Sequence, residues 1–240
     1  MSSLPNMCAV IGMVLQSPTE VDFAMVRRVF LESMIRGKHA TGMSFLPHWS
    51  KEIQTIKEPV SADKFIAQHL DNYTLEDMLN EDGNLYLIGH CRYSTSTLEF
   101  NQPIYNNDKS IVHNGVITQE LPENWKELYG YECMTHNDSE LVLHSPDPMV
   151  EFAHMSMAVC ELTQKQLRVY RNGKRPLYLT STERGRIITS TSDIASRARV
   201  GGVTVELPMN QYTTFDGELN MHINVVNTPE QDFQKVNYDV

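Results

Sequence analysis

The residues best suited to chemistry in this chain are Cys8 and the segment His113-Asn114-Gly115. Cys8 opens an apolar run, Cys8–Leu15, which predicts a strand buried on both faces. A free cysteine is most often a buried structural thiol, but at a strand end it could act as a nucleophile. Asn-Gly between two apolar pairs favours a tight hairpin turn. Alternatively, the Asn114 amide and the Gly115 N–H point at one spot and form an oxyanion hole.

Two charged residues could hold a polar ligand. Arg92 follows the predicted strand Leu85–Gly89 and precedes the hydroxyl residues Tyr93, Ser94 and Thr95, a pattern that suits carboxylate recognition. A salt bridge at the rim is the ordinary alternative. Asp138 precedes a short apolar stretch, where it is either the N-cap of a helix or a carboxylate that binds an ammonium group.

These residues need a framework to position them. Helical spacing predicts a helix over Thr19–Ile35 that covers a sheet through Val21, Met25 and Val29. The loop Arg36–Gly42 is bracketed by two glycines, which indicates a demanding backbone path. From His154 to Val226 the pattern is mainly strands. Turns of the hairpin type are predicted at Asn172-Gly173 and Asp216-Gly217.

Composition excludes several classes of function. The 240 residues carry a formal net charge of -10, with 30 acidic and 20 basic residues and no basic stripe, which argues against nucleic-acid binding. No apolar run has the length of a membrane span, and no signal peptide is evident. The four scattered cysteines predict neither a zinc site nor a disulfide framework, so we expect no metal, no cofactor and a cytoplasmic location.

The motifs occur in an informative order: a cysteine that opens a strand, R-G-x-x-x-x-G, G-H-x-R-Y-S-T, and H-N-G followed by N-D-S-E. This order resembles the class II glutamine amidotransferase domain, a member of the N-terminal-nucleophile hydrolases, over roughly Cys8 to Val226. The segments Asn172–Leu179 and Ser190–Ala195 are also similar to that family. The resemblance implies an α+β fold, the four-layer αββα sandwich of two mainly antiparallel sheets (the Ntn-hydrolase fold), in agreement with many predicted strands and few helices.

The resemblance also implies a reaction, the cleavage of the side-chain amide of L-glutamine to glutamate and ammonia. Cys8 would be the nucleophile, with its own α-amino group as the base, and Asn114 with Gly115 would form the oxyanion hole. The substrate-binding residues would be Arg92 on the α-carboxylate, assisted by Tyr93 and Thr95, and Asp138 on the α-ammonium group. No cofactor is implied.

An α-amino base requires Cys8 to be the first residue of the mature chain. We therefore expect three parts: a leader or pro-segment at 1–7, the amidotransferase domain at 8–226, and a polar tail at 227–240. The synthase domain that commonly accompanies the family's glutaminase is not recognisable, so a separate ammonia-accepting synthase subunit is expected.

The sequence departs from the family pattern in three places. Tyr93 stands where a tryptophan is usual, Gln102-Pro103 stands where His-Pro is frequent, and the segment after Asp138 is short. Two other functions therefore remain open: a non-catalytic glutamine-binding or regulatory module with the same fold, and an amidase for another γ-glutamyl substrate.

Overall fold

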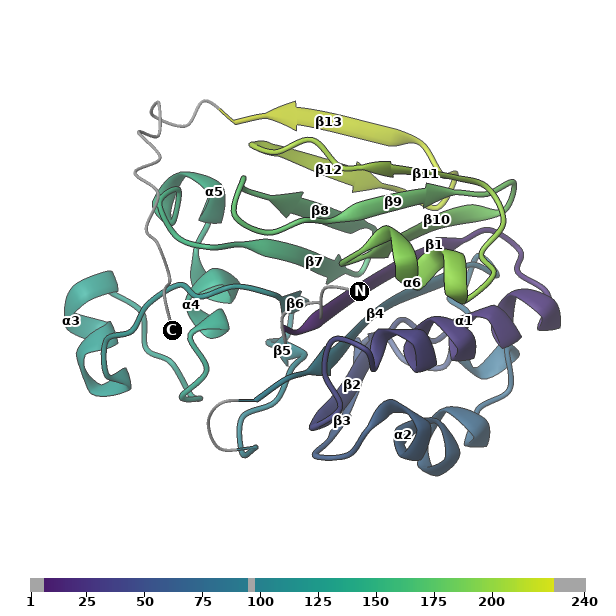
Figure 1. Cartoon of the computed structure of the whole chain (residues 1–240), viewed down its shortest axis with the longest axis horizontal. Helices are drawn as coiled ribbons and strands as arrows, with labels where there is room; N and C mark the ends of the chain where they lie inside the picture. The colour runs from purple at the N-terminus through teal and green to yellow at the C-terminus, as the bar shows by residue number, and fades with distance from the viewer. Residues whose placement is uncertain (1–6, 95–97, 227–240) are drawn as a thin grey trace, which may run out of the picture.

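The computed structural model describes residues 7–94 and 98–226 (Figure 1). The expected tail and all of the expected leader except Met7 lie outside the described residues, as does the predicted site residue Thr95.

Two antiparallel sheets form the centre of the molecule. The first has the strand order β11-β9-β10-β1-β4-β2-β3 and the second β13-β12-β8-β7-β6-β5. The strands of the first sheet are β1 (Ala9–Leu15), β2 (Ala40–Phe45), β3 (Gln54–Glu58), β4 (Leu85–Arg92), β9 (Tyr178–Ser181), β10 (Gly185–Thr189) and β11 (Val203–Glu206). Those of the second are β5 (Ile104–Tyr105), β6 (Lys109–His113), β7 (Ala158–Thr163), β8 (Leu167–Arg171), β12 (Gln211–Phe215) and β13 (Met221–Val225).

Helices cover the outer faces of both sheets (Figure 1). The first sheet packs against α1 (Glu20–Ser33), α2 (Ala62–Gln68) and α6 (Ser192–Arg197). The second packs against α3 (Trp125–Tyr129), α4 (Ser139–His144) and α5 (Pro148–Glu151). Short 3₁₀ turns lie at Leu70–Asn72, Glu76–Met78 and Pro122–Asn124. No helix in the described part of the chain is long and apolar enough to cross a membrane.

Alternation along the strands divides the interior into three layers of side chains. In β1, Ile11 and Met13 pack against the helices of the first sheet, whereas Val10 and Val14 pack against the second sheet. This period of two is the normal consequence of strand geometry. The expected αββα sandwich of two antiparallel sheets is therefore confirmed, and its central layer of side chains lies between the sheets.

Three local predictions are wrong. The Asn114-Gly115 pair does not turn the chain, because Asn114 exchanges both backbone hydrogen bonds with Ala158, at 2.9 and 3.0 Å, and the ladder of β6 with β7 continues in register. Asn172-Gly173 joins β8 to β9, which belong to different sheets, so it forms no hairpin. Val21 is 74% exposed and does not cover the sheet.

The other predictions about these elements are confirmed. The helix after Thr19 is α1, and Met25 and Val29 are buried on its inner face, where Val26 and Phe30 take the place expected for Val21. Asp216-Gly217 lies in the turn that joins the paired strands β12 and β13. The chain from His154 onward is mainly strands.

Candidate active site

Cys8 and Arg92 meet at one edge of the first sheet. Strands β1 and β4 pair with Ala9 opposite Cys91, so one further step in register places Cys8 opposite Arg92. Because side chains alternate along a strand, both residues lie on the side of Val10, which faces the second sheet. The Cys8 thiol is half-buried, and its Sγ donates a weak hydrogen bond of 3.7 Å to the Tyr93 carbonyl oxygen.

Asn114 approaches the same layer from the second sheet. It follows β6, in which Val112 packs between the sheets, and two residues later the same face is presented again. The side chain of Ser110, further back on β6, hydrogen bonds Ser44 of β2 at 2.8 Å across the sheets. Asn114 is 4% exposed, and its side-chain nitrogen Nδ2 is buried without a hydrogen-bond partner in the described chain.

Gly115 sits in the extension of β6 with no room for a side chain. A Cβ atom there would lie 1.8 Å from the Ser156 carbonyl oxygen and 2.5 Å from Nε2 of His113. The neighbours Asn114 and Val116 direct their N–H groups to β7, so the Gly115 N–H points away from that strand and forms no hydrogen bond with another described residue. A buried amide nitrogen and an adjacent free N–H are the donors that an oxyanion hole requires.

The Arg92 guanidinium is held by the loop that follows β4. Its Nη1 donates to the Phe100 carbonyl oxygen at 3.1 Å and to Oδ1 of Asn101 at 2.7 Å. Nδ2 of Asn137 donates to the same Phe100 oxygen at 3.0 Å, which ties the loop before α4 to the end of β4. The neighbouring Tyr93 ring packs against His39, with centroids 4.9 Å apart.

Asp138 occupies the N-cap position of α4 without capping it. Its backbone is helical and its side chain makes no capping hydrogen bond. Instead its Oδ2 accepts the backbone N–H of Ile117 at 2.6 Å and that of Thr118 at 3.3 Å. The carboxylate acts electrostatically on both Arg92 and His113, so it lies near the ends of β4 and β6.

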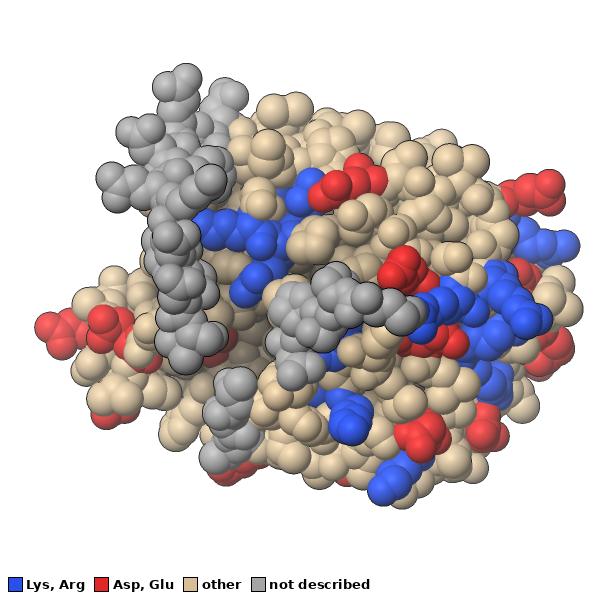
Figure 2. All heavy atoms as spheres, in the orientation of Figure 1, with Lys and Arg blue, Asp and Glu red and all other residues tan. Residues whose placement is uncertain are grey.

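Three arginine side chains act electrostatically on the Cys8 thiol. Burial raises the pKa of the Cys8 thiol, while the Tyr93 backbone and the charges of Arg92, Arg36 and Arg175 act in the opposite direction. Arg36 is 2% exposed, and its Nε and Nη2 have no partner among the described residues; the same holds for Nε of Arg175. Figure 2 shows Lys and Arg side chains gathered near the ends of β8 and β9.

Gly37 of the R-G-x-x-x-x-G motif allows the loop that carries Arg36 to lie close to the end of β4. A Cβ on Gly37 would lie 2.2 Å from the backbone of Arg92 and Tyr93, so only glycine allows the loop to pass so close to β4. His39 then fixes the segment after the strand, because its Nδ1 accepts the Ser94 N–H at 2.9 Å. The sequence motif predicted a constrained loop here, but sequence reasoning did not identify Arg36 as a residue near Cys8.

Gln102, which departs from the family pattern, has a structural role here. Its Oε1 accepts the His113 N–H at 2.5 Å, and its Nε2 donates to the His113 carbonyl at 3.0 Å and to Oγ of Ser139 at 3.1 Å. The side chain therefore continues the sheet alongside β6 and connects it to the first residue of α4. After Asp138 the helices are short: α4 has six residues and α5 has four.

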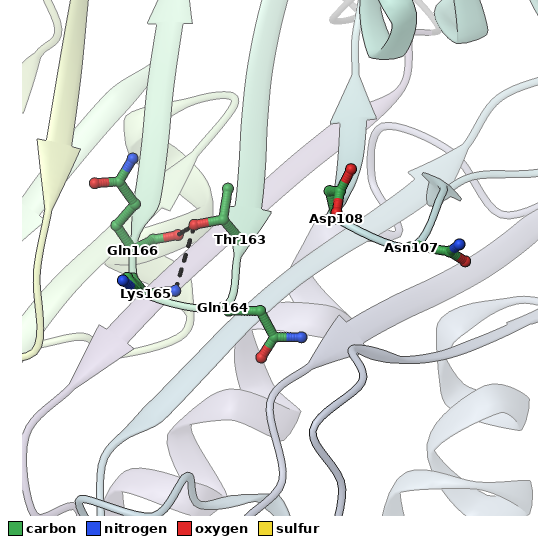
Figure 3. A pocket seen from close by; sticks show the side chains of 6 residues that line it. All are labelled: Asn107, Asp108, Thr163, Gln164, Lys165 and Gln166. Carbon is green, nitrogen blue, oxygen red and sulfur yellow. Dashed lines mark hydrogen bonds between the residues drawn. The ribbon is translucent and has the colours of Figure 1, made fainter.

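Surface depressions elsewhere do not coincide with these residues. The one in Figure 3, of about 310 Å³, is lined by Asn107, Asp108 and residues 163–166. Asn107 and Asp108 precede β6, whereas Asn114 follows it, so this depression lies at the opposite end of the strand. Two others, of about 530 and 420 Å³, are also lined by other residues than Cys8, Arg92, Asn114 and Asp138.

Solved structures share this fold. Glutamine phosphoribosylpyrophosphate amidotransferase from B. subtilis, complexed with ADP and GMP, superposes with a TM-score of 0.65 at 17% identity. A structure described as the allosteric regulatory enzyme of purine biosynthesis gives 0.67 at 16% identity. Each match covers 91% of this chain but 49% of the other, so the chain spans about half the length of these proteins.

A third match has a similar length. A glutamine aminotransferase class-II domain protein from Silicibacter pomeroyi has a TM-score of 0.54 at 12% identity, over 91% of this chain and 98% of that one. No family model and no curated protein matches the sequence. The similarity thus concerns the fold, and it agrees with the resemblance of the ordered motifs: this chain has the fold of the class II glutamine amidotransferase domains, the N-terminal-nucleophile hydrolase sandwich.

Proposed function

We propose that this domain is a glutaminase that hydrolyses the side-chain amide of L-glutamine to glutamate and ammonia, with Cys8 as the nucleophile. The observation that carries the proposal is the buried, unpartnered Nδ2 of Asn114 in the layer between the sheets. A buried donor without a partner costs about 1–3 kcal/mol. Such a cost is explained if the donor is reserved for charge that develops on the substrate during the reaction.

The nucleophile would be activated by the amine of its own residue. In the chain as it stands, the Cys8 nitrogen is an amide bound to Met7 and cannot act as a base. Removal of residues 1–7 would create an α-amine, whose ordinary pKa of about 8 suits a base near neutral pH. This amine would take the thiol proton as Sγ bonds to the amide carbon, and it would return a proton to the departing ammonia.

The intermediate would be held by the donors on β6. Addition of sulfur makes the amide oxygen an oxyanion, which Nδ2 of Asn114 and the Gly115 N–H would stabilise. Loss of ammonia leaves a γ-glutamyl thioester on Cys8. A water molecule, deprotonated by the same amine, would then release glutamate and regenerate the thiol.

The two ends of the amino acid would be gripped by opposite charges. Arg92, positioned by its bonds to Phe100 and Asn101, would bind the α-carboxylate, with Tyr93 and Thr95 beside it. Asp138 would bind the α-ammonium group through its Oδ1, which accepts no hydrogen bond from the described residues. A cytoplasmic setting would keep Cys8 reduced. The ammonia would pass to a separate synthase subunit.

The experiment compares two forms of the protein. One is produced so that Cys8 is the first residue; the other carries Met7→Val, which prevents translation from starting at residue 7, and intact-mass measurement confirms both N-termini. Ammonia release from L-glutamine is expected only from the first form, and Cys8→Ser in that form is the inactive control. Equal release by both forms would rule out the amine mechanism. If neither form releases ammonia but both bind glutamine, the non-catalytic binding module is the better explanation.

A further inference from the structure

A second group of reactive side chains lies away from Cys8, where the loop after α3 meets α4. Cys133 comes from that loop, and Glu140 and His144 lie one turn apart on α4. The sulfur of Cys133, a carboxylate oxygen of Glu140 and a ring nitrogen of His144 all lie within 4.8 Å of one another. Nε2 of His144 is 3.4 Å from Oε1 of Glu140.

The chemistry of this group is that of a zinc site. Thiolate, imidazole and carboxylate are the three protein ligands that zinc accepts, usually in tetrahedral geometry. Bond lengths of that geometry separate neighbouring ligand atoms by about 3.3–3.6 Å. The ligand atoms therefore need to move closer together by roughly 1.2–1.5 Å at most. Calcium and magnesium fit this group poorly, because both prefer oxygen ligands and two of the three ligand atoms here are sulfur and nitrogen.

The surroundings already hold the ligands in place. Glu140 is 4% exposed, and it accepts the backbone N–H groups of Met134 and Thr135 at 2.7 and 2.6 Å. These bonds fold the residues that follow Cys133 back onto α4. The Tyr131 ring stacks on the His144 ring, with centroids 5.9 Å apart, which limits the orientations of the imidazole. Ligand orientation by such neighbours is characteristic of metal sites.

The charges that Cys133 and Glu140 carry when both are deprotonated favour a bound cation. A thiolate and a carboxylate side by side repel each other, and a divalent ion would relieve this repulsion by bonding to both. The cysteine spacing of the sequence gives no signal of such a site, because the other two members are not cysteines.

We propose that Cys133, Glu140 and His144 bind one zinc ion, with water as the fourth ligand, and that the ion fastens the loop before α4 to that helix. On binding, the Cys133 S–H bond breaks, its proton passes to solvent, and a sulfur–zinc bond forms. The same loop continues into Asn137 and Asp138, so zinc also orders the segment that bonds to Phe100 and Ile117. This proposal does not depend on glutaminase activity.

The test uses cobalt as a spectroscopic substitute for zinc in the full chain, freed of metal beforehand. Titration is expected to give a sulfur-to-cobalt charge-transfer band that saturates at one equivalent and disappears when zinc is added. Cys133→Ser is expected to abolish the band. His144→Gln is expected to weaken zinc binding about 100-fold or more, because losing a ligand should cost at least as much as losing a residue that only orients one. Zinc is expected to raise the melting temperature of the parent chain and not that of Cys133→Ser.

Matched controls separate this site from the rest of the chain. Cys8→Ser removes the other half-buried thiol, and His154→Gln removes an exposed histidine outside the cluster; both are expected to keep the band and the zinc affinity. The proposal is overturned if the parent shows no band, if the band survives Cys133→Ser, or if His144→Gln binds zinc like the parent. If Cys133→Ser does not fold without metal, the affinity of His144→Gln decides, because that variant keeps the Glu140 contacts to the loop.

Discussion

The carboxylate of Asp138 accepts a hydrogen bond of 2.6 Å from the backbone N–H of Ile117. This bond joins the start of α4 to the extension of β6, which carries Asn114 and Gly115 only two or three residues earlier. The proposed ammonium-binding residue and the proposed oxyanion hole are therefore held by one tether. A change at Asp138 can act through charge or through this tether, and two substitutions distinguish the two effects.

Asp138→Asn removes the charge but keeps an oxygen that can accept the Ile117 N–H. We expect it to fold like the parent and to bind glutamine weakly. Asp138→Ala also leaves the Ile117 N–H unpaired, which should lower the free energy of unfolding by about 1–3 kcal/mol. Calorimetry with glutamine and denaturant unfolding measure the two effects. Parental glutamine affinity in Asp138→Asn would remove Asp138 from the proposed substrate site.

Arg92→Lys should impair glutamine binding although the charge is kept. A guanidinium is a planar fork of N–H donors that matches a carboxylate, whereas an ammonium is a single point charge. The bonds of Arg92 to Phe100 and Asn101 also set the orientation of this fork. The measurement is calorimetric titration with glutamine. Arg184→Lys, at an exposed position in the turn after β9, is the matched control and should bind like the parent. Equal binding by all three chains would contradict the carboxylate role.

Asn114→Ala should reduce turnover by about 10²–10³ while leaving the fold intact, as does the loss of an oxyanion donor in other enzymes. The assay is ammonia release by a chain that begins at Cys8. Because Nδ2 of Asn114 has no partner in the described chain, its removal should cost little stability. Asn220→Ala, in the turn between β12 and β13, serves as the control. Unchanged turnover in a folded Asn114→Ala protein would leave the residue with a structural role alone.

Gly115→Ala should disrupt the extension of β6. The added methyl group would meet the Ser156 oxygen at 1.8 Å, a backbone atom that cannot move aside without opening the ladder with β7. We expect a lower melting temperature together with loss of turnover. Gly201→Ala adds the same methyl group where nothing lies within 4 Å and should behave like the parent. A Gly115→Ala protein with parental stability would show that the strand adapts.

The buried histidine of β4 should make folding sensitive to acid. Burial, followed by the charges of Arg92 and His113, lowers the pKa of His90 to about 3 from an ordinary value of 6.5. Between these pH values His90 is protonated in the unfolded chain but neutral in the folded chain. Its contribution to the free energy of unfolding is therefore fully present above pH 6.5 and is lost as the pH falls toward 3. Denaturant unfolding at pH 7 and pH 5 should therefore show a loss of stability in the parent.

His90→Gln removes this proton linkage. Between pH 7 and pH 5 its free energy of unfolding should therefore fall by about 2 kcal/mol less than that of the parent. Because only the change in unfolding free energy between the two pH values is compared, the test remains valid if the variant is less stable than the parent at both. His154→Gln, at an exposed position, should keep the parental loss. An equal loss in His90→Gln would mean that other groups account for the acid sensitivity.

The sequence by itself determined the elements whose signals are local. The run from Cys8 to Leu15 predicted a strand buried on both faces, and the helical spacing over Thr19–Ile35 predicted α1. Asp216-Gly217 joined two strands that pair with each other. The order of the motifs then indicated the αββα sandwich, because each motif marks the end of a strand or a loop that this fold brings to the same edge.

Only the tertiary structure decided what long-range partners impose. The Asn114-Gly115 pair is compatible with a hairpin, but β7 supplies hydrogen bonds that carry the strand straight on. Asn172-Gly173 crosses between sheets because β8 and β9 find their partners in different sheets. Arg36 and Arg175 converge on Cys8 although they are far apart in the chain. Turn and cap preferences are worth about 1 kcal/mol, so strand pairing and packing override them wherever the two disagree.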